Sequence, residues 1–259
     1  MEPHSTPPQW LDVLGWISLI AAFASAAYIL YDIYINRYRQ KMTIMEVVYP
    51  TTALYLGPAA VWFYRKYGRR KSTKLTTRHP ERPDERSGGH NRHQHHTGSG
   101  ETSLSGEEGL PRVSWDQTAE AVTHCGAGCT LGDIVAEWSV LALGITIAGT
   151  ALYADIVFDF VLAWLLGIIF QYFTIVPMRE LRPLQGIKEA IKADTLSIIA
   201  FQIGLFAGMI IYQLFLFSNP LPKTTATYWF LMQLSMTLGF FTAYPVNRWL
   251  IRRGVKEAM

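Results

Sequence analysis

The 259-residue sequence contains only two cysteines, Cys125 and Cys129. Two cysteines cannot hold a chain of this length together, which excludes a secreted disulfide scaffold. The sequence also lacks a Walker-type loop, a Gly-x-Gly-x-x-Gly after a strand, and a Gly-x-Ser-x-Gly, so it predicts neither nucleotide binding nor a serine hydrolase. No charged n-region followed by a short apolar stretch and a cleavage site is present, and we therefore expect no signal peptide.

Long apolar runs make up most of the chain, of which 50% is hydrophobic and 17% charged. Runs of about 20 apolar residues are long enough to cross a bilayer core of ~30 Å. They exclude an ordinary soluble domain and predict an all-α polytopic helical membrane protein surrounded by the lipid bilayer. About six transmembrane helices are expected, at residues 10–35, 44–66, 131–151, 153–177, 193–217 and 226–250. The basic residues cluster at the ends of these runs, so we expect no nucleic-acid partner.

One polar stretch interrupts the apolar runs. Residues 69–112 hold 9 of the 23 Lys and Arg and almost no large apolar side chains, a composition that predicts a disordered linker. It includes His90, His93, His95 and His96, which indicate either a loose metal-collecting tract or an ordinary solvated segment. We therefore expect three parts: a two-helix membrane hairpin at 1–67, a His-rich linker at 68–113, and a four-helix membrane domain at 114–259.

The distribution of Lys and Arg predicts the orientation. With six spans and a cytoplasmic start, 19 of these residues face the cytoplasm and 4 face outward, which favours an inner-membrane protein with cytoplasmic termini and linker. Arg37, Arg39 and Lys41 then fall on the wrong side. A second segment that re-enters the membrane and is broken at Gly57-Pro58 would remove this conflict and would place the start of the chain outside.

The segment from Ser114 to Trp138 carries the residues best suited to chemistry. Ser114 and Gln117 match a capping box, which predicts a short helix to about Thr123 and then a glycine-rich turn. His124, Cys125 and Cys129 supply an imidazole and two thiols, a set that suits Cu(I) or Zn(II). Asp133 and Glu137 continue the four-residue spacing and complete the predicted metal site as hard ligands or proton acceptors.

Further acidic residues extend this site into a predicted path. No Lys or Arg occurs from Val113 to Met178, so carboxylates in these spans are expected to be protonated, metal-bound or in contact with water. Asp155 and Asp159 are expected at the outer side, and Asp194 at the cytoplasmic side, within reach of Asp133 or paired with Lys192. Met232 and Met236 are candidate soft ligands, although such pairs usually serve packing.

Three motifs resemble the signature stretches of a bacterial and archaeal membrane-protein family catalogued as domain of unknown function 4396. They are His124-Cys-Gly-Ala-Gly-Cys-Thr-Leu-Gly-Asp133, Ile191-Lys-Ala-Asp-Thr-Leu-Ser197 and Tyr244-Pro-Val-Asn-Arg-Trp-Leu-Ile251. The resemblance covers roughly residues 118–259, and the first two helices are similar to those of the longer members. It implies a multi-pass helical membrane protein and brings no activity with it.

The residues therefore predict a membrane protein, a transporter or metal-binding protein more than an enzyme, that binds and transports or handles a transition-metal cation, with a metallochaperone as a candidate partner. Two alternatives remain open. Cys125 and Cys129 could form a dithiol/disulfide pair that passes electrons. Alternatively, the glycines and acids could only pack helices in a non-catalytic scaffold, and Thr130-x-x-Asp133 could be a second capping box. The small residues of the first helix would permit a homo-oligomer.

Overall fold

Long apolar segments between polar connections fold here as helices that pack side by side. The structure, a computed structural model, describes residues 7–76, 113–179, 182–217 and 221–257, and these ranges contain helices and no strands. The all-α prediction is confirmed. The long helices are α1 (Gln9–Tyr34), α5 (Trp115–Leu143), α6 (Ala151–Arg179), α7 (Pro183–Ile210) and α8 (Ala226–Arg252). The short ones are α2 (Met45–Leu56), α3 (Pro58–Phe63), η1 (Tyr64–Gly68), η2 (Arg69–Lys71), α4 (Thr73–Thr76) and η3 (Ile211–Leu216).

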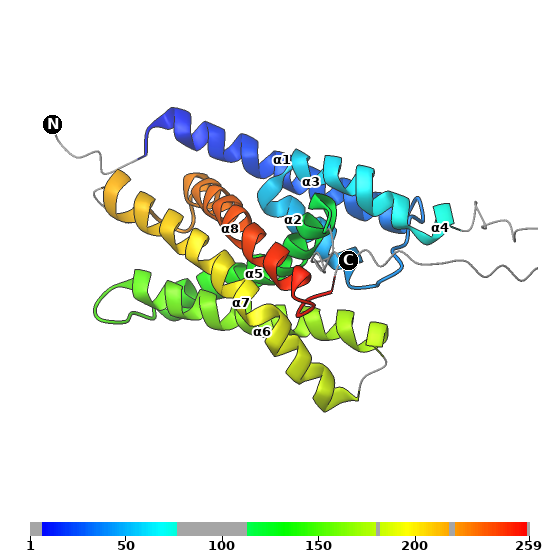
Figure 1. Ribbon diagram of the computed structural model, residues 1–259. Coiled ribbons are helices and arrows are strands. Elements are labelled where there is room, and N and C mark those ends of the chain that lie inside the picture. The colour runs from blue at the N-terminus through cyan, green and yellow to red at the C-terminus, as the bar shows by residue number, and fades with distance from the viewer. Residues whose placement is uncertain (1–6, 77–112, 180–181, 218–220, 258–259) are drawn as a thin grey trace, which may run out of the picture.

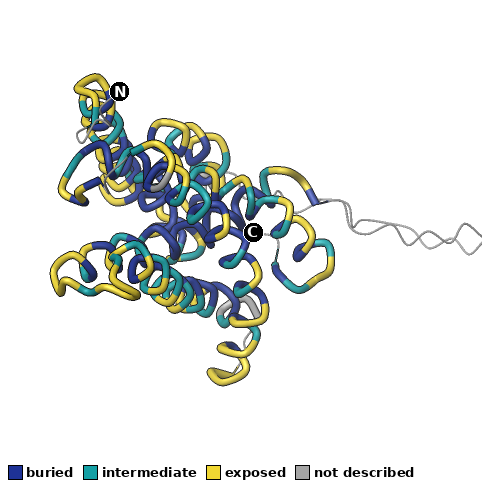
Figure 2. The backbone as a smooth tube through the Cα atoms, turned by 90° about the vertical axis from the view of Figure 1, so that its left-hand side faces the viewer, coloured by how far each residue is buried: buried dark blue, intermediate teal, exposed yellow. Residues whose placement is uncertain are grey.

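Four of these helices are long and apolar enough to cross a membrane. They are α1, α5, α6 through Val176, and α7 continued to Gln213. These four fit a protein that contacts the lipid bilayer, whereas the prediction of six spans is not confirmed. α8 is long but carries more polar residues, because it packs against α1, α5 and α7 in the middle of the bundle. Figure 1 shows α8 between α1 and α7, and Figure 2 shows how burial is concentrated in the interior.

The predicted second span is not one helix. Gly57 adopts a positive φ of 54°, which a side chain would disfavour, and Pro58 then starts α3 in a new direction. α2 has 12 residues, and at a rise of about 1.5 Å per residue it is too short to cross the bilayer core. The break at Gly57-Pro58 that the alternative topology requires is therefore present. The predicted linker falls mostly outside the described residues, including its four histidines.

The predicted turn between Thr123 and Cys129 is wrong, because α5 runs without interruption from Trp115 to Leu143. Its start agrees with the prediction, since Ser114 and Gln117 form the capping box. The glycines serve packing instead of a turn. A Cβ atom at Gly132 would lie 2.4 Å from the backbone nitrogen of Ala163, and one at Gly128 would lie 2.9 Å from Cα of Gly167. Small residues spaced four apart on both helices thus let α5 and α6 approach closely.

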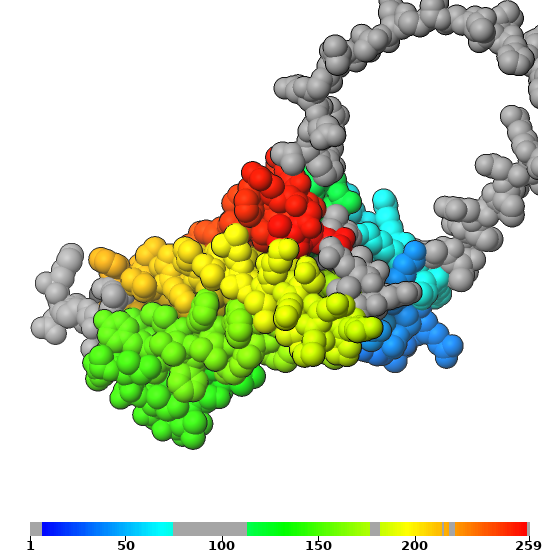
Figure 3. Space-filling view, turned by 60° about the horizontal axis from the view of Figure 1, so that its bottom comes forward, coloured from blue at the N-terminus to red at the C-terminus, as the bar shows by residue number. Residues whose placement is uncertain are grey.

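The first and last long helices run in the same direction. A Cβ atom at Gly15, near the start of α1, would lie 2.8 Å from the backbone of Ala226, the first residue of α8. The beginning of α1 and the end of α8 therefore lie at opposite ends of the bundle, as Figure 1 also shows. Figure 3 shows the end of α8, in red, beside α7, in yellow. The prediction that both termini lie on one side is not confirmed, and this arrangement fits the alternative topology.

The charges agree with that alternative. Among the described residues, Lys223 is the only basic side chain at the end where α1 and α8 begin, while Arg37, Arg39 and Lys41 join the other basic residues at the opposite end. We refer to these as the Lys223 end and the basic end of the bundle. The positive-inside rule predicts that the basic end lies in the cytoplasm.

This orientation predicts the behaviour of reporter fusions in cells. A reporter fused ahead of α1 should be active only as a form that works outside the cytoplasm, and one fused after α8 only as a form that works inside it. Paired alkaline phosphatase and green fluorescent protein fusions measure this directly. If both ends report the cytoplasm, α2 and α3 cross the membrane after all, and the arrangement described here does not hold in the bilayer.

Candidate functional site

Polar side chains line the interior of the bundle along one stripe of α5. Cys125, Cys129, Asp133 and Glu137 are spaced four residues apart, and all four side chains are fully buried. The expectation that they share one face is met, because residues four apart lie above one another on a helix. Asp155 and Asp159 of α6 and Asp194 of α7 are buried as well. We call these seven residues the buried row.

Lys223 neutralises the row at its own end of the bundle. Its ammonium lies 2.5 Å from Oε2 of Glu137 and also pairs with the carboxylate of Asp155. It donates a further hydrogen bond to the backbone oxygen of Glu137 at 3.3 Å. Burial alone would lower the pKa of Lys223, but the two carboxylates raise it above its ordinary value. This lysine is therefore charged although it is almost completely buried.

Beside the carboxylates that Lys223 neutralises, Asp133 and Asp159 have few partners. Oδ1 of Asp133 accepts a hydrogen bond of 3.0 Å from the amide of Gln202, and its Oδ2 accepts none from the described residues. Asp159 is fully buried, and neither of its carboxyl oxygens has a hydrogen-bond partner within the described ranges. Its electrostatic neighbours are Asp133, Glu137, Asp155 and Lys223. Asp159 therefore lies where negative charge is already crowded.

Lys256 neutralises the opposite end of the row. Its ammonium lies 2.6 Å from Oδ1 of Asp194, 3.3 Å from the hydroxyl of Ser197 and 3.5 Å from the backbone oxygen of Ala121. The Ser197 hydroxyl in turn donates to Oδ1 of Asn247 at 2.9 Å. Lys256, and not Lys192, is thus the partner of Asp194. The side chains of both Lys256 and Asp194 are fully buried.

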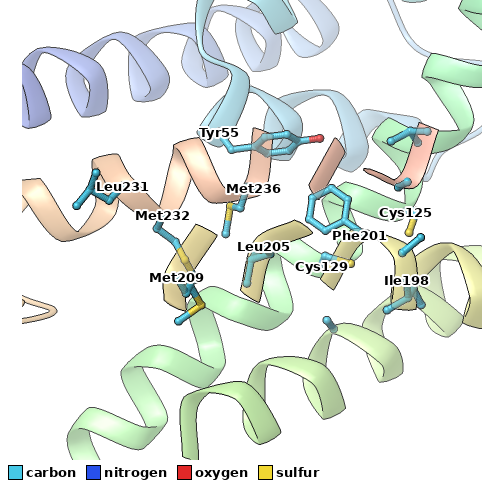
Figure 4. Packing of buried hydrophobic residues seen from close by; sticks show 14 of the residues in the cluster. Tyr55, Cys125, Cys129, Ile198, Phe201, Leu205, Met209, Leu231, Met232 and Met236 are labelled. Atoms are coloured by element: carbon cyan, nitrogen blue, oxygen red, sulfur yellow. The ribbon is translucent and has the colours of Figure 1, made fainter. Parts of the chain in front are cut away.

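The two lysines are separated by most of the thickness of a membrane. Lys256 contacts α5 at Ala121 and Lys223 contacts it at Glu137. With a rise of about 1.5 Å per residue, these contacts are about 24 Å apart along the helix axis. The two cysteines occupy the interval, and Cys129 interacts electrostatically with both Asp133 and Asp194. In Figure 4, Cys125 and Cys129 lie near Phe201 and Ile198 of α7.

Comparison with known proteins identifies the part of the chain that carries this row. A family model described as "Domain of unknown function (DUF4396)" matches residues 114–256. The chain belongs to this family. The DUF4396 region spans α5 to α8 and contains the whole buried row together with Lys223 and Lys256. No curated protein and no solved structure matches the chain. The function must therefore be argued from the residues themselves.

Within the DUF4396 region, the predicted metal ligands do not converge on one point. The thiols of Cys125 and Cys129 interact with each other. His124 instead faces α6, where its Nε2 lies 3.3 Å from the hydroxyl of Thr174 and its ring packs against Phe170. Among the described residues, no group of three or more His, Cys, Asp or Glu side chains is close enough to hold a metal ion. The metal site stays a prediction.

The structure also tests two other predictions, that Asp133 caps a helix and that two methionines are soft ligands. Asp133 does not cap a helix, because α5 passes through it and Thr130 donates to the backbone oxygen of Gly126. Met232 and Met236 are buried in the main hydrophobic cluster, where Figure 4 shows them beside Leu205 and Met209. Both methionines therefore serve packing.

Neither lysine nor Gln202 is among the site residues that the sequence predicts. In the sequence, Lys223 and Lys256 indicate only the topology, because each is far along the chain from the carboxylate that it neutralises. The absence of any basic residue between Val113 and Met178 was the available signal. Buried carboxylates need compensating charge, so an isolated lysine at the edge of an apolar run is a candidate partner.

We predict that Lys256→Met destabilises the protein by about 3–5 kcal/mol, because it leaves Asp194 buried and unpaired. Adding Asp194→Asn removes the uncompensated charge and should restore most of that loss. Thermal unfolding in detergent, followed by a thiol-reactive dye that reports exposure of the two buried cysteines, measures both variants. Lys188→Met, at an exposed position of α7, is the control. Equal melting temperatures for the Lys256 and Lys188 variants would contradict this ion pair.

Proposed function

We propose that this DUF4396 protein moves a cation across the cell's inner membrane along the buried row. The observation that carries the proposal is Asp159, a fully buried carboxyl group without a hydrogen-bond partner in the described chain. Ionised groups inside a membrane domain are costly and typically mark ion and proton pathways. A purely structural role would favour an apolar or hydrogen-bonded side chain at this position.

The local charge balance supports the same conclusion. Asp133, Glu137, Asp155 and Asp159 lie near one another, and within the described residues Lys223 is the ammonium group that interacts electrostatically with Asp159. Four ionised carboxylates cannot share one lysine in a low-dielectric interior without further positive charge. Protons or bound cations must therefore supply the difference. This gives the Lys223 end of the row the capacity to take up and release cations.

The proton is the cation that the row fits best. A metal ion needs several ligands around one point, and no three His, Cys, Asp or Glu side chains of the described residues converge in this way. A proton needs only one acceptor at a time, and successive positions on α5 are about 6 Å apart. Water molecules between such positions would relay the proton from one acceptor to the next. Cys129, between Asp133 and Asp194, joins the two halves of the row.

The lysines at the two ends would control entry. Each ammonium neutralises the carboxylates that an arriving proton must reach, namely Glu137 and Asp155 at the Lys223 end and Asp194 at the basic end. Protonation of these carboxylates weakens the ion pairs and frees the lysine side chain to move. The pairs would thus open as protons arrive and close after they leave.

Asp159→Asn should reduce proton flux at least tenfold, because an amide cannot accept the proton that the carboxylate carries. The measurement uses the purified chain in liposomes that contain a pH-sensitive dye, with a potassium diffusion potential as driving force. The melting temperature should not fall, since the change removes an unpaired charge and leaves the side-chain volume nearly constant.

Asp116→Asn is the matched control for this experiment. Asp116 is an acidic residue of the same α5–α6 unit, but it lies in the first turn of α5 and outside the row. Its variant should conduct as the wild type does. Wild-type flux through Asp159→Asn, or no flux through the wild-type protein, would contradict the proposal.

A transition metal is the second candidate cargo, favoured by the contact between the Cys125 and Cys129 thiols. Two adjacent thiolates suit Cu(I) or Zn(II), with His124, Asp133 or Glu137 drawn in on binding and a metallochaperone as donor. The structural fit is incomplete, because the His124 ring faces Thr174 in this state. Ligand binding would have to turn this side chain or leave it out.

Elemental analysis of detergent-purified protein tests this candidate. The protein is offered copper under reducing conditions and, in a separate sample, zinc. The wild-type chain should then retain about one metal ion, and Cys125→Ser/Cys129→Ser should retain none. Absence of metal from both proteins would leave the dithiol and the scaffold alternatives. Thiol trapping in whole cells separates these two, because only a redox pair would be found oxidised.

A further inference from the structure

A groove on the membrane-facing side of the bundle lies away from the buried row. It has a volume of about 600 Å³ and runs between α3, the first turns of α5 and the middle of α8. Its lining is almost entirely apolar and includes Trp62, Phe63, Trp115, Ala119, Phe240 and Tyr244. Trp62 and Trp115 are about half exposed, so the groove is open sideways to the surrounding lipid. A hydrocarbon chain fits such a lining.

Aromatic rings close the groove at the basic end of the bundle. Tyr67 packs edge-on against Trp115 with ring centroids 5.2 Å apart, and it also contacts Phe63 and Trp62. The Tyr244 hydroxyl donates to the backbone oxygen of Trp115 at 3.3 Å. Tryptophan and tyrosine gather at the boundary between hydrocarbon and headgroups. The closed end of the groove therefore lies at the headgroup level.

A cation lies on this aromatic rim. The Lys66 ammonium is 4.9 Å from the ring centroid of Trp62 and 5.3 Å from that of Tyr67. Trp62 lines the groove, so the Lys66 ammonium lies directly beside the closed end of the groove at the headgroup level. Lys66 and its neighbour Arg65 are exposed, and neither makes an ion pair with any carboxylate of the described residues.

Glu120, next to the groove-lining Ala119, is already paired and does not neutralise this site. Glu120 is occupied by Lys71 at 2.5 Å and by the hydroxyl of Tyr49 at 2.8 Å. Residues 65–74 contain six Lys and Arg and no acidic residue, and of these Arg69 and Lys71 are paired with Asp32 and Glu120. Clusters of four to eight basic residues beside a membrane helix attract anionic lipid headgroups. The apolar groove and the free cation at its rim are thus complementary to one amphipathic molecule.

We propose that this groove binds an anionic phospholipid of the cytoplasmic leaflet. One acyl chain would lie along Phe63, Ala119 and Phe240, and the phosphate would lie at Lys66 with Arg65 nearby. The site is separate from the proposed cation path, and it would anchor the broken second segment to the start of α5 from the lipid side.

Native mass spectrometry of the full-length protein tests the proposal. The protein is purified in a neutral detergent and offered equal amounts of phosphatidylglycerol and phosphatidylcholine. The wild type should retain phosphatidylglycerol preferentially. Arg65→Ala/Lys66→Ala should reduce this preference by about an order of magnitude or more, because each basic side chain near the membrane surface strengthens anionic-lipid binding about fivefold. Ala119→Leu, which fills the groove, should reduce retention of both lipids.

Arg253→Ala is the matched control. Arg253 lies 5.5 Å from the ring centroid of Trp249, which reproduces the cation–aromatic pair at the same end of the bundle without the groove. This variant should keep the wild-type preference. Equal retention of the two lipids by the wild type would overturn the proposal, as would the same loss in the Arg253 variant. Melting temperatures near the wild-type value show that each variant is folded.

Discussion

The cost of burying carboxylates determines how the DUF4396 region is built. Glu137, Asp155 and Asp194 are each isolated from water, and each would be strongly destabilising without a partner. Lys223, just before α8, and Lys256, just after it, supply the missing charge. Because these lysines are remote in sequence, the ion pairs form only when α5, α6, α7 and α8 are all in place. The charge pairs therefore hold neighbouring helices together at each end of the bundle.

Close helix packing makes this arrangement feasible. Gly128 and Gly132 of α5 meet Ala163 and Gly167 of α6 nearly backbone to backbone. This contact brings the acidic stripe of α5 within electrostatic range of Asp159 on α6. A low-dielectric surrounding then strengthens both the attraction to the lysines and the repulsion among the carboxylates. The same geometry that stabilises the ends of the row leaves its middle short of positive charge.

The sequence predicted the parts of this structure that depend on local or periodic signals. The apolar runs indicated α1, α6 and α7, the capping box located the start of α5, and the four-residue spacing placed Cys125 to Glu137 on one face. The glycines were misread as a turn, because a glycine that permits a bend and one that permits close packing look alike until the opposing helix is known. The lysine partners were missed for a related reason: no periodicity connects Asp194 with Lys256.

The position of Asp159 supports the proposed function of the row over a purely structural role. If the carboxylates served only stability, the compensation would be complete, since replacing an unpaired buried charge by a neutral side chain removes a large penalty. Compensation is instead concentrated at the two ends, and the unpaired groups lie between them. A site that must bind and release a cation needs this imbalance, because a fully neutralised carboxylate has no affinity left for an ion in transit. The unpaired Asp159, one helical turn from the residue that pairs with Lys223, and the lysines at the two ends are thus both requirements of the proposed path.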